Sequence, residues 1–99
     1  MTITRTMDGT KVTLAVDGRL ETITAPQLEA EVKALLPQTT EMVIDFTNVV
    51  YCSSAGLRVL LFAHKSMAAK GGKLIVKGAN ETVTQVFDAT GLTSVLNLQ

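Results

Sequence analysis

Apolar and polar residues alternate in the first part of the chain, as they do in strands with one buried face. Val12 to Val16 follows this alternation, and another β-prone stretch, Ile3 to Met7, precedes it. Asp8-Gly9 lies between them and favours the positive backbone angles of a hairpin turn. The pattern predicts a hairpin over Thr2 to Asp17, followed by a connection at Gly18 to Glu21.

A helical repeat of apolar residues follows that connection. Thr24 precedes Ala25-Pro26, so that threonine can cap the helix, proline suits its first turn and Gln27 can reach back to the cap. Pro37 ends the repeat. The residues expected on the buried side are Leu28, Val32, Leu35 and Leu36.

Two further helices have clear start and stop signals. The second helix is expected to begin after Ser54 and to run to about Lys70, where Gly71-Gly72 ends it. The third begins at the capping residue Asn80 and stops at Gly91. The inward residues expected on the second helix are Leu57, Leu60, Leu61, His64 and Ala68.

Three other stretches have the character of strands. The nearly continuous apolar run Met42 to Phe46 predicts a central strand covered on both faces. Leu74 to Val76 predicts another strand, and Val95 to Leu98 a short edge strand or a frayed end. Asp45 interrupts the central run, and two interpretations stay open. It either assists a site at a sheet edge or caps the turn that follows it.

The predicted order of elements is β-β-α-β-α-β-α with an optional last strand. Right-handed crossovers turn this order into an α/β fold, a mixed β-sheet with helices packed mainly on one face. At 99 residues, the chain is expected to form one domain over residues 1–99.

Composition narrows the possible functions. The 9 basic and 9 acidic residues cancel, and no basic cluster favours nucleic acid. A single cysteine and an amino terminus without a signal-peptide pattern predict a reducing, cytoplasmic location. No apolar run approaches the roughly 20 residues of a membrane helix, so no membrane insertion is expected. No glycine-rich phosphate-binding motif is present, and no cofactor is expected.

The stretch Val43 to Leu61 contains the candidate chemistry, because Ser53 and Ser54 fall where a strand gives way to a helix. Unpaired backbone N–H groups and the positive end of the helix dipole can tolerate a phosphoryl group there. Serine is also a preferred helix cap, so both a switch and a cap remain open.

Hydrolysis is a remote alternative. The only histidine, His64, lies ten positions beyond Ser54, roughly 15 Å along a helix, so it cannot act as the base for that serine. Cys52 is either a thiol activated by the helix start or a buried, inert residue. We therefore expect a protein that is not an enzyme and has no metal site.

Several motifs together resemble the STAS domain family, the sulfate-transporter and anti-sigma-factor-antagonist domains. The resemblance spans nearly the whole chain. It is carried by VIDFTNVVYCSSAGLRVLL, Gly18-Arg19-Leu20-Glu21, Thr24-Ala25-Pro26, Lys73-Leu74, Val86-Phe87 and Gly91-Leu92.

In antagonists of this family the corresponding motif is Asp-Ser-Ser-Gly-Leu, with the first serine phosphorylated. The resemblance then places the phosphoacceptor at Ser54, Ser53 at the aspartate and Ala55 at the second serine. Ser53 thus replaces the usual acid, and Glu21 stands where many members have aspartate. The implied partner-binding residues are Glu21, Ser53, Ser54, Ala55, Gly56, Leu57 and Arg58.

The resemblance implies a regulator of transcription. The unmodified protein would sequester an anti-sigma factor serine kinase and free sigma factor, phosphorylation would break the complex, and a serine phosphatase would restore it. Other members of the family are accessory subunits of lipid-transporting ABC complexes. A constitutive subunit of that kind, with the serines as caps and contacts, is the alternative.

Overall fold

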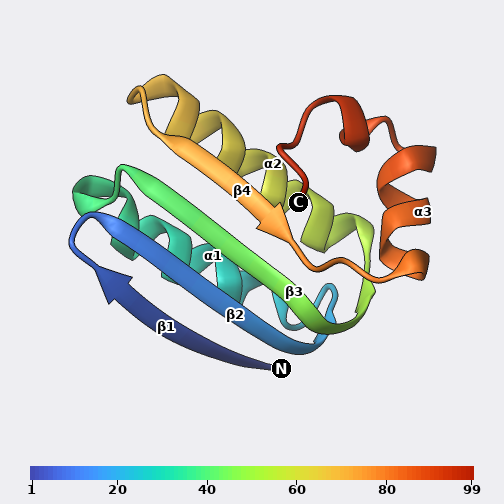
Figure 1. Cartoon of the computed structure of the whole chain (residues 1–99). Coiled ribbons are helices and arrows are strands. Elements are labelled where there is room, and N and C mark those ends of the chain that lie inside the picture. The colour runs from blue at the N-terminus through green and yellow to red at the C-terminus, as the bar shows by residue number, and fades with distance from the viewer.

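The predicted hairpin forms one side of a mixed sheet in the computed structural model, which describes residues 1–99 (Figure 1). Strands β1 (Thr2–Asp8) and β2 (Lys11–Leu20) are antiparallel. Strands β3 (Glu41–Cys52) and β4 (Lys73–Lys77) continue the sheet in parallel, in the order β1-β2-β3-β4. The connection predicted at Gly18 to Glu21 is wrong over residues 18–20, because β2 continues through them beside the long β3.

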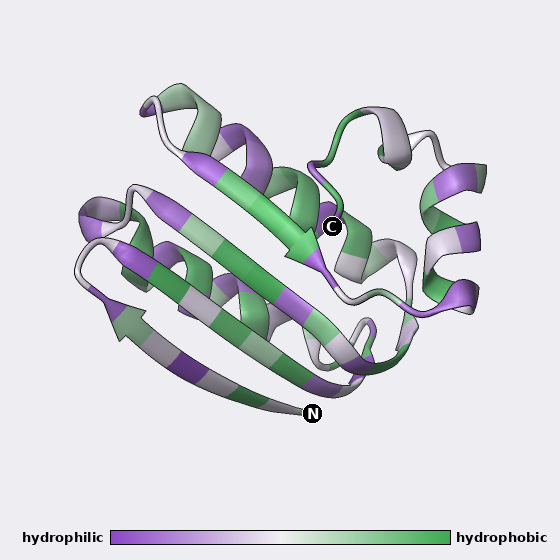
Figure 2. Ribbon diagram, viewed as in Figure 1, coloured by the Kyte–Doolittle hydropathy of each residue, from purple (hydrophilic) through white to green (hydrophobic).

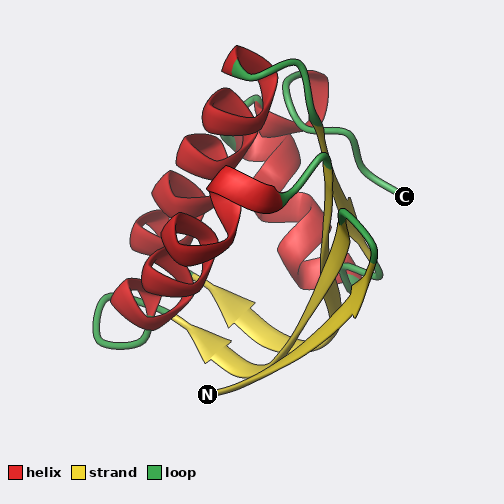
Figure 3. Ribbon diagram, turned by 90° about the vertical axis from the view of Figure 1, so that its left-hand side faces the viewer, coloured by secondary structure: helices red, strands yellow, loops and turns green.

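The helices all lie on one side of this sheet (Figure 3). They are α1 (Ala25–Leu35), α2 (Ser54–Ala69) and α3 (Glu81–Ala89). Short 3₁₀ turns follow α1 at Leu36–Gln38 and α3 at Leu92–Ser94. The predicted fold class is therefore confirmed. None of the helices combines the length and apolar character that a membrane crossing requires.

The core lies between the helices and the sheet face that they cover. Figure 2 shows apolar residues that alternate with more polar ones in β2, that polar residues interrupt in β3, and that form one continuous segment in β4. Phe46 of the sheet packs on Phe87 of α3 with ring centroids 6.2 Å apart. The buried residues of α2 differ in part from those predicted: Leu61 and His64 are only half-buried, and Ala68 is exposed. The residues that α2 buries are Gly56, Leu57, Val59, Leu60, Ala63 and Met67.

The central position predicted for the third strand is confirmed, but the cover predicted for its second face is wrong. No helix lies over that face (Figure 3). Val43 is nevertheless buried there, between its sheet neighbours Thr13 and Ile75. A short apolar row shielded by adjacent strands therefore produced the continuous pattern in the sequence.

The outer edge of β4 is partly covered by the end of the chain. Leu98 forms a single parallel bridge with Val76. The Val76 N–H donates to the Asn97 carbonyl at 2.9 Å, and the Gln99 N–H donates to the Val76 carbonyl at 2.9 Å. The edge strand considered for this segment is thus reduced to one bridge.

Candidate functional site

The candidate site is built where β2 and β3 end side by side. Their final residues, Leu20 and Cys52, are paired in the parallel register. The backbone N–H of Ser53 then donates to the Leu20 carbonyl at 2.9 Å. The loop that starts at Glu21 and the turn that carries the serines therefore leave the sheet at the same edge.

Two irregularities bend β3 on its way to this edge. The pairing with β2 shifts register between Ala15 and Asp17, and again between Gly18 and Arg19, with the additional residues on β3. Extra residues of this kind increase the local twist and change the direction in which side chains point. Together they let a strand twelve residues long curl around the end of β2.

Asp45 stabilises the first of these irregularities. Its Oδ1 accepts from the Thr47 N–H at 2.9 Å and from the Thr47 hydroxyl at 2.6 Å. These bonds lower the pKa of the Asp45 carboxyl. Eight positions of extended chain, roughly 25 Å, separate Asp45 from Ser53. Asp45 therefore stabilises the register shift and does not reach the serine site. The turn that the second interpretation expected after Asp45 does not form, because β3 continues through Thr47.

The two adjacent serines have different surroundings. Ser53 is the N-cap of α2, and its Oγ accepts from the Gly56 N–H at 3.5 Å. Ser54 is the first residue of the helix, is exposed, and its hydroxyl forms no hydrogen bond within the chain. The expectation that Ser54 contributes a cap is wrong, because Ser53 fills that position. The Ser54 hydroxyl is free to react or to bind.

Gly56 fixes the start of α2 against the sheet. A Cβ at this position would lie 2.8 Å from the Cys52 Sγ and 2.8 Å from the Leu20 Cγ. Only glycine allows the helix to approach the ends of β2 and β3 so closely. Leu57 is also buried. These two predicted site residues therefore position the turn from inside, while Glu21, Ser53, Ser54, Ala55 and Arg58 reach the surface.

Cys52 belongs to the interior. It is 1% exposed, and burial raises the pKa of its thiol to about 12. The thiol donates to the Ser53 carbonyl at a sulfur to oxygen distance of 3.7 Å. The burial that the inert interpretation of Cys52 predicted is confirmed, and a thiol that stays protonated at neutral pH is a poor nucleophile.

The loop after β2 forms the other half of the site. The Arg19 guanidinium pairs with the Glu21 carboxylate at 3.2 Å and lies 4.7 Å from the centre of the Tyr51 ring. The Thr24 hydroxyl accepts from the Glu21 N–H at 2.9 Å and donates to the Arg19 carbonyl at 2.7 Å. Thr24 precedes α1 as predicted, but its side chain holds this loop together instead of capping the helix.

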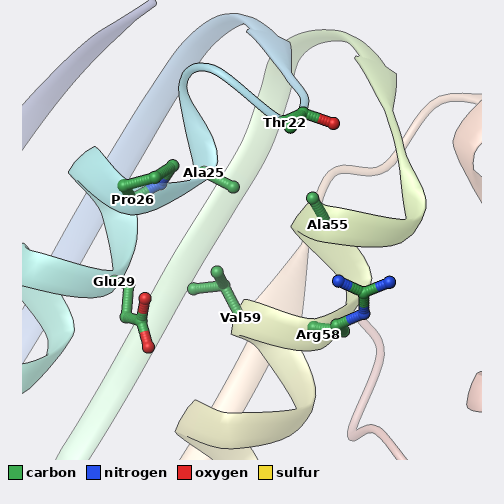
Figure 4. Close-up of a pocket in the computed structure, with 7 residues that line it drawn as sticks. All are labelled: Thr22, Ala25, Pro26, Glu29, Ala55, Arg58 and Val59. Carbon is green, nitrogen blue, oxygen red and sulfur yellow. The ribbon is translucent and has the colours of Figure 1, made fainter.

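A groove of about 320 Å³ runs between the starts of α1 and α2 (Figure 4). Small and apolar side chains form much of its wall, with Glu29 on the α1 side and Arg58 on the α2 side. The complete lining is Thr22, Ala25, Pro26, Glu29, Ala55, Arg58 and Val59. The members from α1 and its loop were not predicted, because a sequence pattern does not show how closely two helices approach.

Comparison with known proteins identifies the family. The sequence model described as "Mlab, STAS domain" matches residues 3–98. The chain belongs to the STAS domain family, as its motifs predicted.

The similar curated proteins are regulators. The chain is 26% identical to the anti-sigma-B factor antagonist of Listeria monocytogenes, over 93% of this chain and 82% of that protein. It is 28% identical to the anti-sigma-B factor antagonist of Bacillus subtilis, over 84% of this chain and 76% of that protein. These relatives are named for a regulatory binding activity.

Solved structures have the same fold. The anti-sigma factor antagonist SpoIIAA in its unphosphorylated form superposes with a TM-score of 0.86 at 20% identity, over 99% of this chain and 88% of that chain. The STAS domain of a SulP transporter from Vibrio cholerae gives a TM-score of 0.71 at 19% identity, over 94% of this chain and 75% of that chain. At these identities the likeness concerns the fold.

Proposed function

We propose that this chain, acting as one STAS domain over residues 1–99, is a cytoplasmic anti-sigma factor antagonist switched by phosphorylation of Ser54. In the unmodified state it sequesters an anti-sigma factor serine kinase, and sigma factor is released. The kinase transfers the γ-phosphoryl group of ATP to the Ser54 Oγ, which loses its proton, and ADP leaves. A serine phosphatase reverses the modification.

The observation that carries this proposal is that the two serines have different structural roles. Ser53 provides the helix cap, so the exposed Ser54 hydroxyl has no structural duty that modification would disturb. Relatives named as anti-sigma factor antagonists support the antagonist function. The proposed partner surface consists of Glu21, Ser53, Ser54, Ala55 and Arg58, positioned by the buried Gly56 and Leu57.

The proposed switch acts through local charge. A phosphoserine adds about −1.5 to −2 charges at neutral pH. Ser54 lies at the surface, where this charge stays in water and leaves the core untouched. The charge would repel an acidic partner group or prevent close packing on the start of α2, so binding is lost without unfolding of the domain.

The direct test is the intact mass of the purified protein after incubation with ATP and a lysate of its own host. We expect the wild type to gain one phosphoryl group. The Ser54→Ala variant should gain none, while the Ser53→Ala variant, which keeps the acceptor, should still be modified.

Two results would contradict the proposal. A phosphoryl shift that persists in Ser54→Ala would place the acceptor elsewhere. No shift in the wild type, while a control substrate is phosphorylated in the same lysate, would exclude a Ser54 kinase from that lysate.

The description of the matching family model favours a second candidate function. On that alternative, the chain is a constitutive STAS accessory subunit of a lipid-transporting ABC complex, and the exposed start of α2 packs permanently on a larger subunit. Ser54→Ala would then leave complex assembly unchanged. Co-purification of a tagged chain with a host ABC transporter ATPase, and not with a serine kinase, would favour this alternative.

A further inference from the structure

Arg58 is the one charged member of the proposed partner surface that lacks an ionic partner. The only other charged member, Glu21, is paired with Arg19 at 3.2 Å. Across the groove, Glu29 is paired with Lys33 at 3.4 Å. Arg58 takes part in none of the ion pairs within the chain, and its side chain is exposed. The surface therefore presents one uncompensated positive charge.

Arg58 also lies one helical turn after Ser54, on the same side of α2. Residues four apart on a helix have Cβ atoms roughly 5 to 6 Å from each other. Helical side chains tilt toward the amino terminus, and Figure 4 shows the Arg58 guanidinium directed toward the first turn, where Ala55 lies. An acidic group placed four residues before a basic one is the favourable order for such a pair.

We propose that Arg58 makes the ionic contact between the partner surface and the partner protein, and that a phosphoryl group on Ser54 removes this contact. In the unmodified chain the guanidinium binds a carboxylate of the partner protein. After modification it pairs with the phosphoserine of its own chain. This inference rests on the proposed function, since it explains how Ser54 phosphorylation weakens partner binding.

The groove adds a second expectation about the chemistry of the partner, an apolar group beside the acidic one. Ala25, Pro26 and Val59 contribute apolar atoms to the wall of the groove that Arg58 also lines. A guanidinium is suited to bidentate pairing with a carboxylate. The partner is therefore expected to present an acidic residue next to an aliphatic side chain. A competing phosphate, with more charge and three acceptor oxygens, would be held intramolecularly and would not need to diffuse to the guanidinium.

The experiment uses the full chain with phosphoserine incorporated at position 54 during translation. The second ionisation of the phosphate is followed by ³¹P NMR as the pH is varied. We expect the measured pKa of the wild type to lie below that of Arg58→Gln by about 0.3 to 0.7 units, the shift that a surface ion pair produces. Arg58→Lys, which keeps the charge, should recover most of this difference.

Lys65→Gln is the matched control, because it removes one positive charge from the same helix about 16 Å beyond Ser54. Its phosphate should titrate as in the wild type. Equal pKa values for the wild type and Arg58→Gln would overturn the proposal. The helix terminus acts equally on all four proteins, so it cannot produce the expected difference.

A second measurement addresses the partner directly. Calorimetry with the purified anti-sigma kinase of the host should show that Arg58→Gln weakens binding about tenfold or more. Phosphoserine at position 54 should weaken binding less in Arg58→Gln than in the wild type, because the two changes remove the same contact. Fully additive effects would contradict the proposal. If no kinase modifies or binds the chain, the proposed function fails, but the ³¹P titration still decides whether Arg58 captures the phosphate.

Discussion

At the scale of single residues, two neighbouring serines with the same side chain have unlike roles. The difference comes from backbone position: Ser53 has the extended conformation of an N-cap, and Ser54 is the first helical residue. The sequence alone could not assign these roles, since helix boundaries predicted from a pattern shift by a residue or two. The resemblance to the STAS family selected Ser54, and the structure shows why that residue is free.

Substitution of each serine by alanine separates the two roles. Ser53→Ala should lower the free energy of unfolding by about 0.5 to 1 kcal/mol, the lower part of the range for a lost cap, because its hydrogen bond is long. Ser54→Ala should change it by less than about 0.5 kcal/mol. Urea denaturation measures both. The reverse order of stability would show that Ser54 is the cap.

The buried thiol predicts a loss of stability in alkali. Burial raises the pKa of Cys52 from 9.0 to about 12, so above about pH 9 the unfolded chain loses this proton before the folded chain does. The contribution of the neutral thiol to the free energy of unfolding is fully present below pH 9 and decreases as the pH rises toward 12. The free energy of unfolding falls by at most about 1.4 kcal/mol per pH unit from this cause.

Cys52→Ala provides the reference for this measurement. Every other ionisable group is common to the two proteins, so the difference between them reports the thiol. Urea denaturation between pH 8 and pH 11 should show a steeper decline for the wild type than for the variant. Parallel curves would mean that the thiol is open to water in the folded protein.

At the scale of elements, the site depends on how α2 is attached to the sheet. Strands β2 and β3 end in register, and the close approach at Gly56 seats the helix on their last residues. The turn between β3 and α2 is therefore held from both sides. This attachment sets where the backbone of Ser54 and Arg58 lies relative to the loop at Glu21.

Gly56→Ala tests this attachment. Alanine in place of glycine normally stabilises a helix interior by about 1 kcal/mol. Here the new methyl group would lie 2.8 Å from both Cys52 and Leu20, and such overpacking costs about 1 to 3 kcal/mol. We expect a net loss of stability in thermal denaturation, partly recovered by adding Cys52→Ala. A variant more stable than the wild type would contradict the close approach.

At the scale of the whole molecule, the pattern of apolar residues was sufficient for the order and type of the elements. The hairpin at Asp8-Gly9 and the helix capped by Asn80 have local signals, and both formed as predicted. The full length of β3 had no such signal, because its polar residues Thr47 and Asn48 are typical of a turn. In the structure these two polar residues lie at a shift in the register between β2 and β3, which the sequence pattern does not reveal.

The candidate site was predictable only in part, for a similar reason. Ser54 and Arg58 lie in one continuous motif, so the resemblance to a family could identify them together. The groove needs Pro26 and Glu29 from α1 as well as Val59 from α2. That juxtaposition arises because two successive crossovers, β2 to β3 through α1 and β3 to β4 through α2, lie on the same side of the sheet. The pairing of Arg19 with Glu21, which leaves Arg58 as the unpaired charge of the surface, likewise becomes visible only in three dimensions.

A switch at Ser54 is tested most directly by comparing two forms of the full chain. One is unmodified and the other contains phosphoserine at position 54. Each is titrated by calorimetry against the purified anti-sigma kinase of the host. We predict that the unmodified chain binds and that the modified chain binds at least about tenfold more weakly, a loss of about 1.4 kcal/mol. Equal affinities for the two forms would contradict a switch at Ser54.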